Sequence, residues 1–315
     1  MKAANTLFPV LAIVAAVLAI AGLAHEPDGQ APAVPAWLEL VSSERIMEHI
    51  IALSGEDTRE VASRGAVQAA NYIVASLRAS GWSVEKHSFN IDTRSGTVTV
   101  TNVTADYPGA ADSDSVIILC THYDSRAEEP GGHAPGADDN ASGTAVLLEL
   151  ARVLPGIDGG AAGPRVKLLF FGGEEDSMLG STRFVSGIGH ERNRIIGAVN
   201  VDMIGYDSEG PKDFVIFTDH ASRGLAQTVA DCAGRISRLR CETTLTSYAN
   251  SDHGAFWNGG VRAISIWEGY DHNPYYHSSH DTWDKLSPTF MKQLVHILLC
   301  AVLRQQPHGR PASQS

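Results

Sequence analysis

One stretch of the chain, VIILCTHYDS at residues 116–125, decides the fold class. Its first five residues are all apolar, and polar residues follow at once. A strand that is apolar on both faces is typical of a parallel sheet covered by helices on both sides. Further apolar runs lie at residues 166–171, 195–203, 214–217 and 263–267. Together they predict an α/β fold with a mixed, mostly parallel central sheet and helices on both faces.

Helical segments are expected between and around these strands. Apolar side chains recur with helical spacing at residues 43–54, 64–80, 141–154, 221–237 and 286–303. Residues 84–91 and 97–107 instead alternate between polar and apolar side chains, which predicts two antiparallel strands near an edge of the sheet. No internal repeat interrupts the pattern, so we expect a single domain over residues 41–305.

The two ends of the chain differ from this pattern. Residues 1–24 place Lys2 before an apolar run that ends in small residues, which predicts a secretory signal or, if it is uncleaved, a membrane anchor. The protein is therefore expected to be secreted or periplasmic, with membrane contact only through an uncleaved N-terminal segment. Residues 25–40 are predicted to be a linker and residues 306–315 a disordered tail. The net charge of -12 disfavours nucleic-acid binding, which relies on clustered Lys and Arg.

Four cysteines bear on the compartment in which the protein folds. Cys232 and Cys241 are close in sequence within a polar region, and we expect a local disulfide between them in an oxidising compartment. Cys120 ends an apolar strand and Cys300 lies in an apolar helix, so both are predicted to be buried free thiols.

Polar clusters follow several of the predicted strands, where ligands of open α/β sheets bind. Taken singly, such clusters have ordinary explanations: an aspartate before a helix often caps it, and a glutamate pair after a strand is usually solvated. A carboxylate within an apolar strand, as at Asp202, is costly to bury unless it is paired or binds a metal. The clustered residues are His122, Asp124, Glu174, Glu175, Asp202 and His277, together with GADDNASG at 136–143 directly before a helix.

Two histidines and several carboxylates at neighbouring strand ends supply ligands that zinc accepts. Two zinc ions can share one bridging carboxylate and leave open positions for water and substrate. Asp124 can hold the second ring N–H of His122, and Glu174 can take a proton from the attacking water. The residues alone leave Asp138 and Asp139 as equal candidates for the bridging ligand, and they do not specify the reaction.

The chain resembles the M28 metallopeptidases, which are di-zinc aminopeptidases of the bacterial secreted type. The resemblance runs from about residue 40 to residue 305 and keeps the family's motif order and spacing. It rests on HYDS at 122–125, GADDNASG at 136–143, FFGGEE at 170–175, NVDMIGY at 200–206, SDHGAF at 251–256 and NPYYHSSHDT at 273–282. The family's bridging aspartate, which precedes a cis peptide bond, matches Asp139 rather than Asp138.

The resemblance implies a role for each matched residue. One zinc ion would be held by His122, Asp139 and Asp202, and the other by Asp139, Glu175 and His277. Glu174 would be the general base that activates a water bridging the two ions, and the substrate would be a peptide with a free N-terminus. Tyr276 is the expected donor to the oxyanion, with Tyr248 a less favoured candidate. His253 and His280 are expected to be structural or to support ligands, and no pattern indicates an oligomeric state.

Two alternatives remain at this point. Glutaminyl cyclases have a HYDS-like string and a Glu-Glu pair, but they use one zinc ion and cyclise an N-terminal glutamine. They have Ser in place of Asn140, and their last His usually follows Trp where this chain has Tyr276, so both positions favour the peptidase. A non-catalytic binding protein on a peptidase scaffold would typically lack metal ligands, whereas all five are present here.

Overall fold

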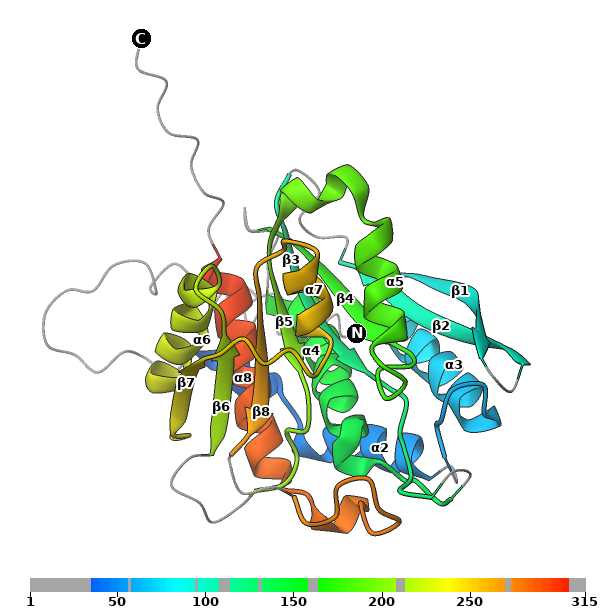
Figure 1. Ribbon diagram of the computed structural model, residues 1–315. Coiled ribbons are helices and arrows are strands. Elements are labelled where there is room, and N and C mark those ends of the chain that lie inside the picture. The colour runs from blue at the N-terminus through cyan, green and yellow to red at the C-terminus, as the bar shows by residue number, and fades with distance from the viewer. Residues whose placement is uncertain are drawn as a thin grey trace, which may run out of the picture.

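The computed structural model describes residues 35–55, 58–93, 96–107, 114–129, 132–157, 164–207, 213–269 and 273–305. These residues form one eight-stranded sheet in the order β1-β2-β4-β3-β5-β8-β6-β7, with helices on both faces (Figure 1). The predicted α/β fold with a mixed central sheet is confirmed. The predicted signal segment and C-terminal tail lie outside the described residues.

The sheet is parallel in its centre and antiparallel towards its sides. Strands β4 (Arg165–Phe171), β3 (Val116–His122), β5 (Ile195–Val201) and β8 (Ala263–Glu268) run parallel to one another. At one edge, β1 (Ser83–Thr93) and β2 (Gly96–Asp106) form the predicted antiparallel pair. At the other, β6 (Phe214–Thr218) runs antiparallel to β8 and parallel to β7 (Cys241–Leu245).

Two layers of helices cover the sheet (Figure 1). Ile117 and Leu119 of β3 pack into the larger layer, whereas Ile118 and Cys120 pack into the smaller one. Successive residues are therefore buried on opposite faces, which explains the unbroken apolar runs. The larger layer contains α2 (Ser43–Ser54), α3 (Arg64–Ala79), α4 (Gly143–Ile157), α6 (Arg223–Ile236) and α8 (Pro288–Arg304), and the smaller contains α5 (Leu179–Gly187) and α7 (His253–Asn258).

Several helices begin at a serine whose side chain caps the first turn. Ser42, Ser63 and Ser287 each accept a hydrogen bond from the backbone N–H three residues later. Each serine satisfies one of the unpaired N–H groups at a helix N-terminus, so it marks where α2, α3 or α8 starts.

Some elements differ from the sequence expectations. Strand β7 lies at the sheet edge, half exposed, and therefore lacks the apolar run that marks an inner strand. Residues 36–40, predicted to belong to the linker, form a 3-10 helix that packs against α8. Trp37 is only 1% exposed there, and Nε2 of His296 lies 2.9 Å from the carbonyl oxygen of Leu38. The linker boundary was wrong for these residues because one buried tryptophan anchors them.

The disulfide joins Cys232 in α6 to Cys300 in α8, so the predicted local pair of Cys232 with Cys241 was wrong. Packing of α6 against α8 brings the two Cα atoms to 5.9 Å across a sequence separation of 68. Cys241 is held on β7 as a free thiol, and Cys120 is buried and free as predicted. Sequence distance alone could not identify a partner that helix packing supplies.

Replacing both Cys232 and Cys300 by serine is expected to lower the free energy of unfolding by about 4 kcal/mol, because the crosslink closes a long loop in the unfolded chain. Urea unfolding of the purified variant measures the loss. Cys241→Ser, which removes a free thiol, is the matched control and should unfold like the wild type. Equal midpoints for all three proteins would contradict the assigned pairing.

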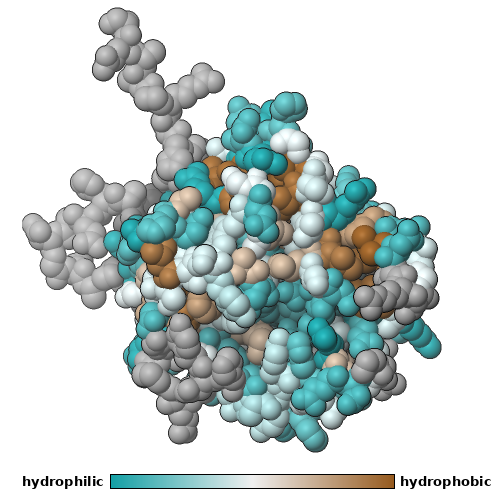
Figure 2. Space-filling model, viewed as in Figure 1, coloured by the Kyte–Doolittle hydropathy of each residue, from teal (hydrophilic) through white to brown (hydrophobic). Residues whose placement is uncertain are grey.

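Within the described ranges, no helix is both long and apolar enough to cross a bilayer. On the face drawn in Figure 2, hydrophobic residues lie in separate patches among hydrophilic ones. Export and membrane contact therefore stay predictions that rest on residues 1–24.

Candidate metal centre

The polar clusters of the sequence meet at the carboxyl ends of the parallel strands. His122 is the last residue of β3, Asp202 directly follows β5, and Glu174 and Glu175 follow β4. Strands β4 and β5 flank β3 on opposite sides, so the order of the strands reverses at β3. A crevice at such a switch point is where open α/β sheets bind their ligands.

Two further segments bring side chains to this crevice. Asp139 lies in the turn Ala137–Ser142, directly before α4, and His277 lies in the loop after β8. The backbone of His277 has a left-handed φ of 56°, which is uncommon for a residue other than glycine. Strained conformations of this kind occur preferentially at functional sites.

Among the described residues, three groups of three side chains lie close enough to hold an ion, and two of them share Asp139; the third is His122, Glu174 and Glu175. In the first group, Nε2 of His122 lies 3.2 Å from Oδ1 of Asp139 and 3.2 Å from Oδ1 of Asp202. In the second, Nε2 of His277 lies 3.2 Å from Oδ2 of Asp139 and 3.0 Å from Oε2 of Glu175. Neighbouring ligand atoms of a tetrahedral zinc ion are about 3.3 Å apart when each bond is about 2.0 Å. The spacing therefore fits two metal ions that share one carboxylate.

Unpaired polar atoms in the second group support this fit. Among the described residues, Nε2 of His277 and Oε1 of Glu175 are buried polar atoms without a well-directed hydrogen bond. Buried polar groups in folded proteins almost always have a partner. A metal ion held by His277 and Glu175 would supply one.

The charges of the cluster also favour a cation. Burial lowers the pKa of His277, but the carboxylates of Asp139 and Glu175 outweigh burial and raise this pKa to about 9. At His122, the effect of burial is likewise outweighed, chiefly by Asp202, and the pKa is well above its usual value. Burial raises the pKa of Glu175 to about 8. These shifts arise because several carboxylates share a buried space, and a divalent cation would offset the same negative charge.

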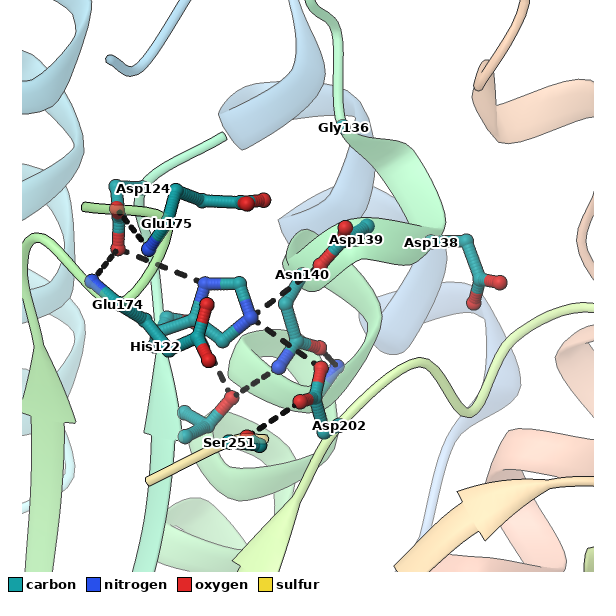
Figure 3. Close-up of polar contacts among 12 residues, drawn as sticks. His122, Asp124, Gly136, Asp138, Asp139, Asn140, Glu174, Glu175, Asp202 and Ser251 are labelled. Atoms are coloured by element: carbon teal, nitrogen blue, oxygen red, sulfur yellow. Dashed lines mark hydrogen bonds and ion pairs between the residues drawn. The ribbon is translucent and has the colours of Figure 1, made fainter. Parts of the chain in front are cut away.

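Asp138 and Asp139, which the residues alone could not separate, point to opposite sides of the turn (Figure 3). The carboxylate of Asp138 accepts hydrogen bonds from the backbone N–H of Gly205 and from Nδ2 of Asn273, both at 2.7 Å. These hydrogen bonds of Asp138 stabilise the turn on the side opposite Asp139. Asp139 faces His122 and His277, which is the position that a shared ligand would need.

The turn that carries Asp139 is packed tightly against β3 and β5. The Asp139–Asn140 peptide bond is cis, as the resemblance implied. Nδ2 of Asn140 donates to Oγ1 of Thr121 and to the carbonyl of Val201, each at 3.0 Å. A Cβ atom at Gly143 would lie 2.6 Å from that carbonyl, so only glycine allows this approach. The position of Asp139 is therefore fixed by its neighbours in the turn.

Asp124 and Ser251 contact the candidate ligands from outside (Figure 3). Oδ1 of Asp124 lies 3.5 Å from Nδ1 of His122, and the carboxylate accepts the backbone N–H groups of Glu174 and Glu175 at 3.2 Å each. Asp124 therefore links the ring of His122 to the loop after β4. The hydroxyl of Ser251 donates to Oδ2 of Asp202 at 2.6 Å, which orients that carboxylate.

The remaining predicted residues lie around this cluster. A carboxylate oxygen of Glu174 is within 4.8 Å of ligand atoms of His122 and Glu175. The ring of Tyr276 stacks on that of His277, with 3.7 Å between the centroids, and Tyr276 is 47% exposed. His253 is buried edge-on against Trp257, with a ring separation of 4.6 Å, which fits its expected structural role.

Two supporting residues were not singled out in the sequence. The carboxylate of Asp281 accepts the backbone N–H groups of Asp138 at 2.9 Å and of Asp139 at 3.0 Å. Arg59 is fully buried beside the same turn. Asp281 lies within the last motif, NPYYHSSHDT at 273–282. A single arginine in a polar stretch is normally solvated, so Arg59 gave no signal.

Comparison with known proteins identifies the family. A profile of peptidase family M28 matches residues 102–302. A probable leucine aminopeptidase of Trichophyton verrucosum is 30% identical over 280 residues, which cover 84% of this chain and 74% of that protein.

Solved structures share the fold at low sequence identity. The zinc aminopeptidase BSAP from Bacillus subtilis has a TM-score of 0.73 at 17% identity, over 87% of this chain and 97% of that one. A glutaminyl cyclase of Bacteroides thetaiotaomicron has a TM-score of 0.68 at 19% identity, over 84% and 99%. The profile match and the fungal relative, with the shared fold, show that this chain belongs to peptidase family M28.

Proposed function

We propose that this protein is a zinc-dependent aminopeptidase that removes N-terminal residues from peptides and holds two zinc ions per chain. The observation that carries the proposal is the position of Asp139, whose two oxygens face His122 and His277 from opposite sides. Membership of a peptidase family implies peptide substrates. The names of the fungal relative and of the Bacillus subtilis neighbour support aminopeptidase activity and zinc.

The proposed reaction is hydrolysis of the first peptide bond. Bound zinc ions would make the attacking water more acidic and polarise the scissile carbonyl. Glu174 would accept the proton of that water and return it to the leaving amine. Burial raises the pKa of Glu174 well above its usual value, which makes its carboxylate a stronger base.

Tyr276 is proposed as the hydrogen-bond donor to the developing oxyanion. Burial first, and then the carboxylates of Asp139 and Glu175, raise the pKa of Tyr276, so its phenol stays protonated at neutral pH. A donor placed where negative charge develops stabilises the transition state. Its half-exposed ring, stacked on that of His277, is compatible with contact to a substrate.

A cavity of about 280 Å³ adjoins Glu175 and supports an exopeptidase. It is lined by Glu60, Glu128 and Asp176, and by Arg126 as the one basic residue among its lining. The excess of carboxylates would attract the positively charged N-terminus of a peptide.

The proposal is tested by counting zinc in the purified protein and by assaying a panel of aminoacyl p-nitroanilides. We expect two zinc ions per chain, hydrolysis of at least one substrate, and loss of activity on chelation that added zinc reverses. The matched control is the same substrate with an acetylated N-terminus, which should not be cleaved. Absence of bound metal would refute the proposal, and cleavage of the acetylated substrate would refute the exopeptidase assignment.

Glutaminyl cyclisation is the competing activity on this fold. It releases ammonia from an N-terminal glutamine, so ammonia released from a glutaminyl peptide measures it directly. We expect hydrolysis of aminoacyl substrates without such release. One zinc ion per chain together with ammonia release would favour the cyclase instead.

We also propose that the mature protein is secreted or periplasmic. The disulfide between Cys232 and Cys300 supports this location, because such bonds persist outside the reducing cytoplasm. Cell fractionation with N-terminal sequencing tests it: recovery in the cytoplasm with residues 1–24 still attached would contradict the proposal.

A further inference from the structure

Arg59 is the one lysine or arginine with a buried side chain in the part of the chain that the structure describes, at 0% exposure. It lies in the connection between α2 and α3, outside every motif that identified the metal centre. Burying an unpaired charge is unfavourable, so a buried arginine needs partners that satisfy it.

The guanidinium of Arg59 binds both segments that lead into the centre. Its Nε donates to the carbonyl oxygen of Tyr123 at 2.7 Å, next to His122. Its Nη2 donates to the carbonyl of Gly136 at 2.8 Å, at the start of the turn that carries Asp139. One planar group thus ties the end of β3 to the turn before α4.

Further hydrogen bonds complete this connection. Nη1 of Arg59 donates to the carbonyl oxygens of Pro135 and of Leu53, the latter at 3.1 Å. The backbone N–H of Arg59 donates to Oγ of Ser125 at 2.9 Å, and that hydroxyl donates to the carbonyl of Ala134 at 2.8 Å. A lysine has one point charge and three donors, so it cannot reproduce this flat arrangement.

Carboxylates surround the guanidinium on the side of the centre. Burial lowers the pKa of Arg59 to about 10, and four carboxylates oppose the effect of burial, so the group is charged at neutral pH. These carboxylates belong to Asp281, Asp124, Asp139 and Glu175. Charge alone would make Arg59 repel a bound zinc ion, so any contribution to metal binding must come from geometry.

We propose that Arg59 is a positioning residue for metal binding: its guanidinium holds His122 and Asp139 at the separation that zinc requires before the metal arrives. This inference rests on the proposed metal centre and adds to it a residue that is not a ligand. Without Arg59, the turn at Gly136 and the end of β3 would move independently, and zinc binding would have to restore their alignment.

The test compares Arg59→Lys and Arg59→Met with the wild type in competition with a chromogenic zinc chelator. Both variants should bind zinc about 10- to 100-fold more weakly, the range found when groups that orient metal ligands are replaced. Excess zinc should restore aminopeptidase activity in both, because the ligands themselves are intact. If Arg59 acted through charge alone, the Met variant would bind zinc more tightly than wild type and the Lys variant would be unchanged.

Leu77→Ala separates metal binding from general stability. Leu77 is a fully buried residue of α3, and its apolar side chain takes no part in the hydrogen bonds described above. Its replacement should lower the thermal midpoint while zinc affinity stays at the wild-type value.

Several outcomes would overturn the inference. Unchanged or tighter zinc binding in the Met variant would overturn it. Failure of both variants to fold in excess zinc would also overturn it, because Arg59 would then be required by the whole fold. Absence of zinc from the wild type would instead refute the proposed function, so the two failures are distinguishable.

Discussion

Glu174→Gln is expected to lower kcat by about 10²- to 10⁴-fold, the contribution of a well-placed general base. Glutamine keeps the size of the side chain and can form hydrogen bonds, but it cannot accept the proton of the attacking water. Zinc content should remain that of the wild type, because the proposed ligands are His122, Asp139, Glu175, Asp202 and His277. KM should change little, since the lost interaction belongs to the transition state.

Steady-state kinetics on an aminoacyl p-nitroanilide, with zinc quantified on the same sample, make this measurement. Glu191→Gln is a suitable control, because Glu191 is an exposed glutamate that precedes β5, at the opposite end of that strand from Asp202. The control should keep most of the activity. Near-normal turnover by Glu174→Gln would remove Glu174 from the mechanism, and loss of zinc from it would mean that Glu174 is a ligand.

Asp139→Ala is expected to remove both zinc ions and to abolish activity at least as fully as Glu174→Gln does. Both groups of three that would hold the proposed ions include Asp139, so its loss leaves two protein ligands per ion where three are expected. By contrast, loss of Asp202 or of Glu175 should weaken the binding of chiefly one zinc ion, the one that the lost side chain would contact. Metal analysis after dialysis distinguishes these patterns.

Asp138→Asn is the matched control for Asp139. The two residues are adjacent and buried, but the carboxylate of Asp138 is bonded to Gly205 and Asn273 on the far side of the turn. Its replacement should reduce stability while zinc content stays high. Loss of zinc from Asp138→Asn, with retention by Asp139→Ala, would reverse the assignment of the shared ligand.

Most of the fold was predictable from the pattern of apolar side chains. The inner strands are buried on both faces, so their sequences are apolar throughout, and the helices of the larger layer show a clear helical spacing. Strand β7 was missed because an edge strand contacts water and carries threonines instead. The partner of Cys300 was missed because it depends on how α6 packs on α8, which no local pattern encodes.

The candidate site was predictable where polar residues interrupt apolar sequence. His122 and Asp202 end apolar strands, and that contrast identified them before any resemblance was considered. Asp138 and Asp139 have the same chemistry and neighbouring positions, so only the direction of their side chains separates them. Arg59 could not be found, because its burial depends on carbonyl groups of segments that are distant in the sequence.

The positions of the proposed ligands along the chain affect when in folding the protein can bind metal. The proposed ligands His122 and His277 stand far apart in the sequence. Of the proposed ligands between them, Asp139 precedes α4, and Glu175 and Asp202 follow two different strands, so a half-folded chain cannot gather the set. Binding of metal would add its free energy only once the central sheet is complete. The proposed enzyme would therefore become active only as the last step of its folding, and a chain whose sheet is disrupted would lose both its zinc and its activity.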